Sequence, residues 1–219
     1  MPETVISRLK ALVGNARCAW FDLCYGVQTR DELQSHSLEI DSPNREHGTD
    51  YSPTHPKFMR TVLQRLPIEH KQYCFVDYGS GKGRVLLVAA SYPFQRIVGV
   101  EYARDLHEIA KRNVERFRGR RACKTIELVH ADALAFEIPR NPLVVFMFNP
   151  FRPPVLGPLM EKIRNSLLES PRDAWLIYAS PFHTSLISQP FSLVETGTYH
   201  NVYHGAPTAK GLGDSGRLR

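Results

Sequence analysis

The sequence lacks the features of several protein classes. No apolar run approaches the roughly 18 residues that a membrane-spanning helix needs, and the first residues lack the basic stretch and apolar segment of a secretory signal peptide. The four cysteines include no C-x-x-C pair, so we expect neither a metal site nor a disulfide framework. These absences favour a protein of the reducing cytoplasm that has no membrane partner.

The sequence also lacks a dominant block of one charge, although its formal net charge is +6. Lysine and arginine are densest between residues 111 and 124. A solvated helix face is one interpretation of this cluster, and a surface for nucleic acid or an acidic partner is the other. Aromatic residues are not interleaved through the cluster, as binding of a single strand would favour.

The most informative segment covers residues 75–84, with the sequence FVDYGSGKGR. An apolar run ends at Asp77, and a turn containing Gly79, Gly81 and Gly83 then leads into an apolar-periodic stretch. Glycine permits a positive φ and a close approach of the backbone to a ligand. The start of the following helix adds N–H groups and a partial positive charge. This pattern predicts a ligand-binding turn.

Two common ligand classes do not match this turn. The phosphate loop G-x-x-x-x-G-K-[ST] fails because Gly83 follows Lys82 where serine or threonine is required. The dinucleotide pattern G-x-G-x-x-G fails because the third glycine comes one residue early. The remaining match is D-x-G-x-G-x-G, which is typical of turns that bind S-adenosylmethionine (SAM).

Polar residues also follow the next predicted strands. Glu101 ends the run at 97–100, Asp132 follows the run at 126–130, and Asn149 begins the tripeptide Asn-Pro-Phe after the run at 143–148. Open α/β sheets bind ligands at the carboxyl ends of their strands. A glutamate there can accept from both hydroxyls of a ribose, and an aspartate can accept from an adenine amino group.

The order of predicted elements indicates an α/β fold. Apolar residues at helical spacing predict a helix beginning near Glu3 and further helices over 58–66, 106–117 and 155–167. A fifth strand is expected over 174–179. The closing hairpin is expected over 191–203, broken at Thr196-Gly197. Strands that alternate with helices predict a mostly parallel sheet with right-handed crossovers.

From Phe21 to Phe182 the chain resembles bacterial class I SAM-dependent methyltransferases and, more distantly, the non-SET histone-lysine methyltransferases. The matching segments are Phe21-Asp22, Tyr25-Gly26-Val27, Tyr51-Ser52-Pro53-Thr54, Asp77–Arg84, Gly99-Val100-Glu101, Asp132, Asn149-Pro150-Phe151 and Ser180-Pro181-Phe182. The histone branch has no proline beside its asparagine, whereas adenine N-methyltransferases carry [DNS]-P-P-[YF]. The resemblance therefore leaves the methyl acceptor open between protein lysine, nucleic acid and a small amine.

The resemblance implies a Rossmann-like class I methyltransferase sheet with a SAM-binding domain over 51–204. Helical spacing and turn formers predict a helical cap and loop over residues 1–50, and the scarcity of apolar residues predicts a flexible tail over 205–219. The resemblance also implies a role for each site residue. Asp77 approaches the methionine end of SAM, Glu101 holds the ribose, and Asn149 faces the transferable methyl group. The other expected cofactor-binding residues are Tyr51 and Thr54 on a closing loop, Gly79, Ser80, Gly81 and Gly83 in the turn, and Asp132 and Ala133 at the adenine.

The expected chemistry is direct in-line methylation of an amine. We expect Pro150 to hold Asn149 extended, so that its amide oxygen accepts from the nucleophile. Phe151, Tyr178 and Phe182 are expected to form a partly dry pocket that favours the neutral amine. Two other functions remain open: an NAD-binding oxidoreductase, in which Asp77 and Glu101 serve a dinucleotide, and a catalytically silent SAM-binding partner subunit.

Overall fold

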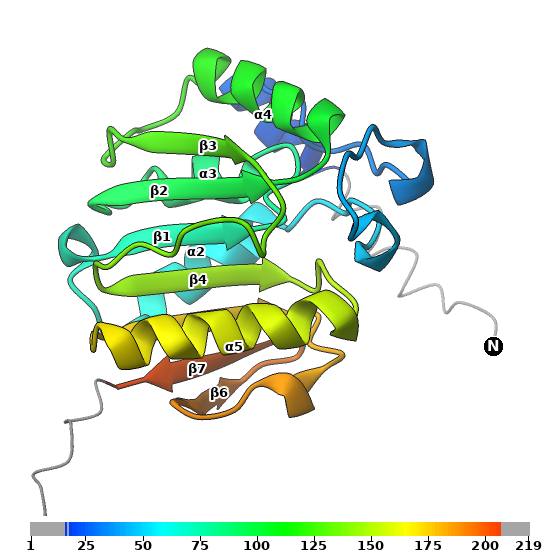
Figure 1. Ribbon diagram of the computed structural model, residues 1–219. Helices are drawn as coiled ribbons and strands as arrows, with labels where there is room; N and C mark the ends of the chain where they lie inside the picture. The colour runs from blue at the N-terminus through cyan, green and yellow to red at the C-terminus, as the bar shows by residue number, and fades with distance from the viewer. Residues whose placement is uncertain (1–15, 17, 207–219) are drawn as a thin grey trace, which may run out of the picture.

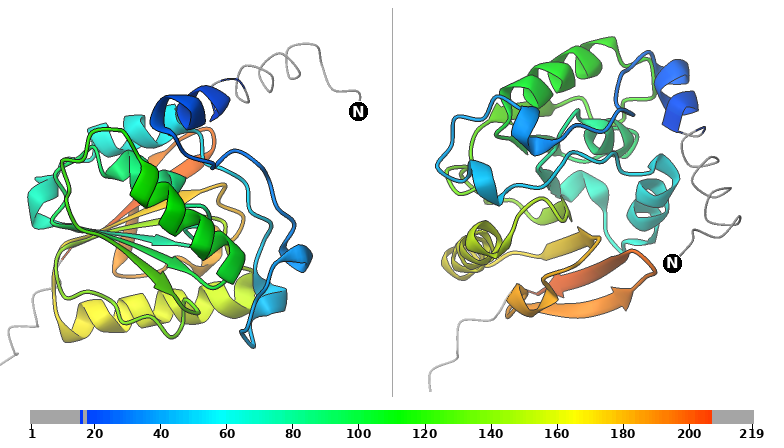
Figure 2. Two further views of the ribbon diagram at one scale, coloured as in Figure 1. Left: turned by 90° about the horizontal axis from the view of Figure 1, so that it is seen from above. Right: turned by 90° about the vertical axis from the view of Figure 1, so that its right-hand side faces the viewer.

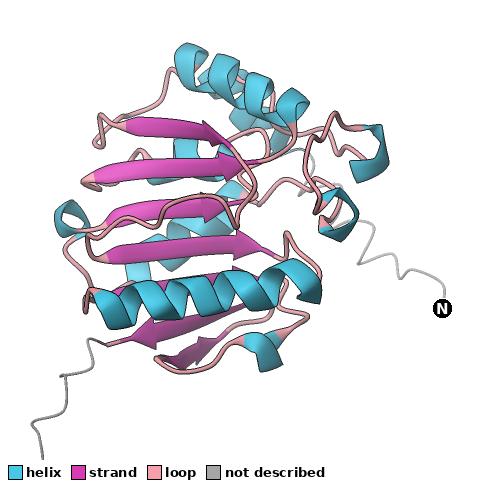
Figure 3. Cartoon of the chain, viewed as in Figure 1, coloured by secondary structure: helices cyan, strands magenta, loops and turns pink. Residues whose placement is uncertain are grey.

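The computed structural model describes residue 16 and residues 18–206 of the chain. Its centre is a seven-stranded sheet with the strand order β3-β2-β1-β4-β5-β7-β6 (Figures 1 and 3). The parallel strands are β1 (Cys74–Tyr78), β2 (Arg96–Glu101), β3 (Ile126–His130), β4 (Leu143–Phe148) and β5 (Ala174–Ala179). β6 (Phe191–Thr196) and β7 (His200–Gly205) form the antiparallel hairpin, and β7 pairs with β5.

Helices cover both faces of the sheet and its β3 end. The α-helices are α2 (Pro56–Arg65), α3 (Arg84–Ala89), α4 (Arg104–Arg116) and α5 (Pro153–Glu169). The described residues also form the short 3-10 helices η1 (Ser35–Ser37), η2 (Arg45–His47), η3 (His70–Gln72) and η4 (Thr184–Leu186). In Figure 1, α5 lies in front of the sheet, α2 and α3 lie behind it, and α4 lies at the top beside β3. None of the described helices is long and apolar enough to cross a membrane.

Side chains of each central strand alternate between two apolar cores, as the pleat of a strand requires. Phe75 of β1 and Phe146 of β4 pack with α2 and α3, whereas Val76 and Val145 pack with α5. The central strands are buried on both faces, which explains their nearly continuous apolar sequences. The sheet thereby holds the carboxyl ends of β1, β2 and β4 in fixed register.

The N-terminal segment covers the carboxyl edge of the sheet. Residues 18–25 are helical and pack on the α2 side through Phe21. Residues 27–50 then cross in front of the strand ends (Figure 2, right). Isolated β-bridges join Leu33 to Tyr51, Ile40 to Ala103 and Gly48 to Phe151. This segment therefore forms one wall of whatever binds at that edge.

The main elements predicted from the sequence are present. Three predicted strands, at 126–130, 143–148 and 174–179, agree with the structure at both ends. The break at Thr196-Gly197 separates β6 from β7, and β7 includes Gly205. The helix expected from Glu3 and most of the expected tail lie outside the described residues.

Candidate active site

The glycine turn follows β1 and takes a left-handed conformation at three positions. The φ angles are 75° at Gly79, 54° at Gly81 and 82° at Gly83. A Cβ at Gly81 would collide with the ring of Tyr51, and a Cβ at Gly79 would lie 2.6 Å from the Cβ of Pro150. Glycine is therefore required for both the backbone conformation and the space.

Asp77 lies directly before this turn and is only 2 % exposed. Its carboxylate lines the cavity above the turn, and no described residue makes a hydrogen bond or ion pair with it. Burial raises its pKa well above the ordinary value, and the nearby charge of Glu101 adds to the effect. A buried carboxylate without a partner is unfavourable in the free protein and suits a cationic ligand group.

Glu101 lies at the end of β2, on the opposite side of the turn from β4. Its Oε2 accepts from the Gly81 N–H at 2.8 Å, and its Oε1 accepts from the Ala103 N–H at 2.9 Å. Burial raises the pKa of Glu101, and these backbone bonds oppose the rise. Each carboxylate oxygen has two lone pairs, so both can still accept from a ligand hydroxyl.

Three hydrogen bonds from described residues occupy most of the acceptor capacity of Asp132 in this arrangement. Its Oδ2 accepts from Ser42 Oγ at 2.5 Å and from Asn44 Nδ2 at 2.9 Å, while its Oδ1 accepts from the Leu134 N–H. Burial acts to raise the pKa of Asp132, but the bonds from Ser42 and Asn44 outweigh it and lower the pKa. Asp132 thus anchors the loop that contains Ser42, and the bonds from this loop compete with its expected contact to adenine. Ala133 beside it is buried, and its N–H donates to no described residue.

Tyr51 and Tyr102 form the roof of the cavity. The Tyr51 ring lies over the turn, and its hydroxyl donates to the carbonyl of Thr29 at 2.7 Å. The hydroxyl of Tyr102 is buried with no partner among the described residues. Burial raises the pKa of Tyr102 to about 12, and the charges of Glu101 and Asp132 contribute. Sequence reasoning missed Tyr102, although its position directly after Glu101 could have indicated it.

Arg84 was also missed, although it directly follows the third glycine of the turn. Its side chain is 2 % exposed and lines the cavity. Nε donates to Thr29 Oγ1 at 2.6 Å, and Nη1 donates to the Thr54 carbonyl at 3.4 Å. Nη2 lies 3.6 Å from Asp22 Oδ1 and makes no hydrogen bond. A buried guanidinium with an unused donor can accept an anionic ligand group.

Asn149 follows β4 but is not extended. Its φ is 43°, so the expectation that Pro150 would hold it extended is wrong. The tight turn after β4 outweighs the usual preference before proline, and asparagine tolerates this left-handed conformation better than most residues. The Tyr178 hydroxyl donates to Asn149 Oδ1 at 3.0 Å. This bond fixes the amide oxygen and leaves one of its lone pairs for another donor.

The loop before Tyr51 occupies the backbone acceptors beside Asn149. Thr49 Oγ1 donates to the Asn149 carbonyl at 2.9 Å, and the Thr49 N–H donates to the Pro150 carbonyl at 3.1 Å. The cavity that remains measures about 60 Å³, whereas sites for small ligands usually measure roughly 300–1,000 Å³. A ligand of the size of SAM therefore requires residues 42–51 to move outward.

The expected dry pocket is only partly formed. Phe151 is 6 % exposed and lines the cavity, and Tyr178 is fully buried beneath Asn149. Phe182 is 73 % exposed and lies outside the cavity lining, so its expected place in the pocket is wrong. Phe146 and Phe148 of β4 line the cavity instead. The chain turns away from the sheet after β5, which leaves Phe182 in solvent.

Comparison with known proteins identifies the fold. The model of the family "Histone methylation protein DOT1" matches residues 44–133, which include the turn, Glu101 and Asp132. No curated protein matches the chain. A predicted N6-adenine-specific DNA methylase from Listeria monocytogenes superposes with a TM-score of 0.54 at 12% identity, over 71% of this chain and 52% of that chain.

Two further solved structures are similar. TrmN from Thermus thermophilus gives a TM-score of 0.51 at 17% identity, over 70% of this chain and 49% of that chain. Magnesium protoporphyrin IX methyltransferase from Synechocystis, solved with bound SAM, gives 0.50 at 14% identity, over 68% and 78%. The chain thus spans about half the length of the DNA methylase and of TrmN. These likenesses confirm the predicted class I methyltransferase fold and support SAM as the cofactor.

Proposed function

We propose that this protein is a SAM-dependent methyltransferase that transfers a methyl group to the nitrogen of an amine. The observation that carries the proposal is the Asp77 carboxylate, which is buried, unpaired and directed into the cavity at the glycine turn. An amino acid ammonium group would supply the missing positive partner. Among the described residues, no lysine, arginine or histidine side chain forms an ion pair with the Asp77 carboxylate.

The remaining polar groups fit the other parts of SAM. Glu101 keeps acceptor capacity for the two ribose hydroxyls, and the Ala133 N–H keeps donor capacity for an adenine ring nitrogen. Arg84 Nη2 can take the carboxylate of the methionine moiety. The glycine turn leaves room for the amino acid portion, because side chains are absent at Gly79 and Gly81.

When bound, SAM supplies a methyl group already activated by its sulfonium. The chain's task is to align the nucleophile and to exclude water, which can account for about 7–11 kcal/mol of barrier lowering. Asn149 Oδ1, fixed by Tyr178, accepts an N–H of the incoming amine and orients its lone pair. Phe151 and Phe148 provide an apolar wall that favours the neutral amine by desolvation.

The two other functions explain less of the site. An NAD-binding oxidoreductase gives the unpaired Asp77 no cation and leaves Asn149 without a task. A silent SAM-binding subunit has no need for an amide oxygen held by Tyr178 at the cavity rim. The molecule that receives the methyl group stays open between protein, nucleic acid and a small amine. The matching family model concerns histone methylation, whereas one similar structure is a predicted DNA methylase. A cytoplasmic location remains part of the proposal.

Titration calorimetry with SAM, S-adenosylhomocysteine and NAD tests the cofactor. We expect binding of the first two and none of NAD, and the reverse result would overturn the assignment. Labelled SAM incubated with a lysate fractionated into protein, nucleic acid and small molecules tests the activity. Label should enter one fraction with the wild-type protein and enter it about 10²-fold more slowly with Asn149→Ala. SAM binding without any transfer would instead support the silent subunit.

A further inference from the structure

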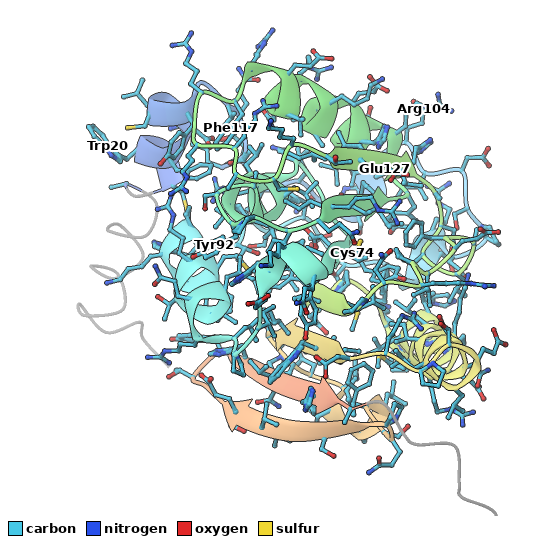
Figure 4. All side chains as sticks on the ribbon, turned by 90° about the vertical axis from the view of Figure 1, so that its left-hand side faces the viewer. Trp20, Cys74, Tyr92, Arg104, Phe117 and Glu127 are labelled. Carbon is cyan, nitrogen blue, oxygen red and sulfur yellow. The ribbon has the colours of Figure 1, made fainter. Side chains whose placement is uncertain are left out.

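The helix spanning residues 18–25 has one buried face and one apolar face in solvent. Phe21 and Tyr25 pack inward, with their ring centroids 4.8 Å apart. Trp20 and Leu23 lie three positions apart on the other face and are 67% and 75% exposed. Figure 4 shows Trp20 on the outer side of the molecule. These two large apolar side chains on one helix face form a small exposed apolar patch that a partner could cover.

Basic side chains flank this helix on both sides. On the α2 side, Arg60 donates to the Tyr25 hydroxyl at 3.3 Å. On the α4 side, Arg118 packs against Gly26 and its N–H donates to the Tyr25 carbonyl, while Arg121 lies over the ring of Phe117. Phe117 in turn contacts Tyr25, with ring centroids 5.2 Å apart. Lys57 on α2 and Arg116 on α4 complete a group of five cations.

These five cations differ from many others on the surface. Salt bridges occupy Arg65, Lys71, Arg96, Arg104, Lys111 and Arg164. Among the described residues, no carboxylate pairs with any of the five around helix 18–25. Unpaired cations around one helix create a positive field that attracts a polyanion.

A hollow lies between this helix and the start of α2. It measures about 320 Å³ and is lined by Trp20, Phe21, Cys24, Tyr25, His55, Pro56, Lys57 and Arg60. Thr54, one residue before this lining, belongs to the wall of the cofactor cavity. The linings of the hollow and of the cofactor cavity are thus joined along the chain by residues 54–56.

We propose that this basic and aromatic surface binds single-stranded nucleic acid. An unpaired base can stack on the exposed indole of Trp20, while Lys57, Arg60 and Arg118 bind phosphates. In the sequence, aromatic residues are not interleaved through the basic cluster at 111–124, but the fold adds aromatic side chains next to it. Tyr25, from almost 100 residues away, contacts Phe117 of the cluster, and Trp20 lies on the same helix as Tyr25.

Two other partners fit the surface less well. An acidic peptide would pair with the cations but would leave the flat indole unused. An anionic membrane would need Trp20 to protrude from a convex face, whereas Trp20 forms the rim of a hollow. If the proposed methyltransferase function is also correct, this inference implies that the methylated amine belongs to a nucleobase. Binding itself requires no SAM.

Intrinsic fluorescence provides a direct test, because the chain has two tryptophans and Trp175 is only 8 % exposed. Titration with a 12-nucleotide single-stranded RNA, without SAM, should quench the emission. Trp20→Ala should weaken binding about 5- to 150-fold, as expected for loss of one stacked base, when binding is measured by fluorescence anisotropy of an end-labelled RNA. Tyr199→Ala, which removes a 76% exposed aromatic on the β6–β7 turn, should change neither.

Salt dependence tests the phosphate contacts. The slope of log K against log salt concentration should fall by about 0.7 for each of Lys57→Ala and Arg118→Ala, and should not change for Arg164→Ala. Absence of binding at low salt, or equal binding by Trp20→Ala and wild type, would overturn the inference. Binding to phosphatidylglycerol vesicles or to a polyglutamate peptide in place of RNA would also overturn it. SAM titration of the same samples tests the proposed function independently, because a protein that binds SAM but not RNA contradicts only the nucleic-acid inference.

Discussion

Replacing Asp77 with asparagine should separate cofactor binding from stability. The change keeps the size of the side chain and removes a charge that has no partner in the free protein. A hydrogen bond to a charged group contributes about 1.5–3 kcal/mol, and each 1.4 kcal/mol is a factor of ten in affinity. We therefore expect Asp77→Asn to weaken SAM binding by about 10- to 150-fold.

The same change should stabilise the free protein at neutral pH. The pKa of Asp77 is raised in the folded state above its ordinary value of 3.8, so the folded protein holds this proton to a higher pH than the unfolded chain. The wild-type protein therefore loses stability as the pH rises from about 4 through the raised pKa, and the variant does not. The melting temperatures should agree near pH 4, and the variant should melt higher at pH 8.

Calorimetry and thermal melts at several pH values measure both effects. SAM affinity of the wild type should rise with pH through the raised pKa, because the bound cation favours the ionised carboxylate. Asp31→Asn is a matched control, since Asp31 is exposed and lies outside the cavity. A variant that binds SAM as tightly as the wild type, or that melts lower at pH 8, would refute the assignment of Asp77 to a ligand cation.

Three further predictions concern the other walls of the site. Asn149→Ala should leave SAM affinity nearly intact while lowering kcat by about 10²-fold, and Tyr178→Phe should lower kcat by a smaller factor. Calorimetry and a turnover assay measure the two quantities. Unchanged turnover with a lower melting temperature would show that Asn149 is a turn residue only. Arg84→Met should reduce the preference for S-adenosylhomocysteine over methylthioadenosine, which lacks the amino acid portion, and an unchanged preference in calorimetry would exclude a carboxylate contact. Limited proteolysis should cut within residues 42–51 faster when SAM is present, because the hydrogen bonds of Ser42, Asn44 and Thr49 that hold the segment in the free protein must break to admit the cofactor. Equal cutting rates would show that the segment does not move outward.

The sheet was predictable from the sequence, but the contacts that close the site were not. Strands such as β1 and β4 are buried on both faces, so their apolar runs and the polar residues that end them are visible locally. The bond between Ser42 and Asp132 joins residues 90 positions apart, and nothing in either segment predicts it. The left-handed φ of Asn149 was missed because a local preference before proline was applied where the tight turn decides the conformation.

The environment of Arg84 was likewise not predictable from the local sequence. Its place after the third glycine was visible, but its burial depends on Thr29 and Asp22, which come from the N-terminal segment. A sequence pattern indicates which residues reach the carboxyl edge. Which of them keep a free donor or acceptor there depends on long-range packing.

The loop that ends at Tyr51 contacts both ends of the proposed reaction path. Ser42 and Asn44 bind Asp132 at the adenine end, and Thr49 binds the carbonyls of Asn149 and Pro150 at the acceptor end. One movement of this loop would release both ends together. An enzyme built in this way is expected to be distributive: the acceptor would leave each time the spent cofactor is exchanged, so a nitrogen that takes more than one methyl group would receive each in a separate encounter.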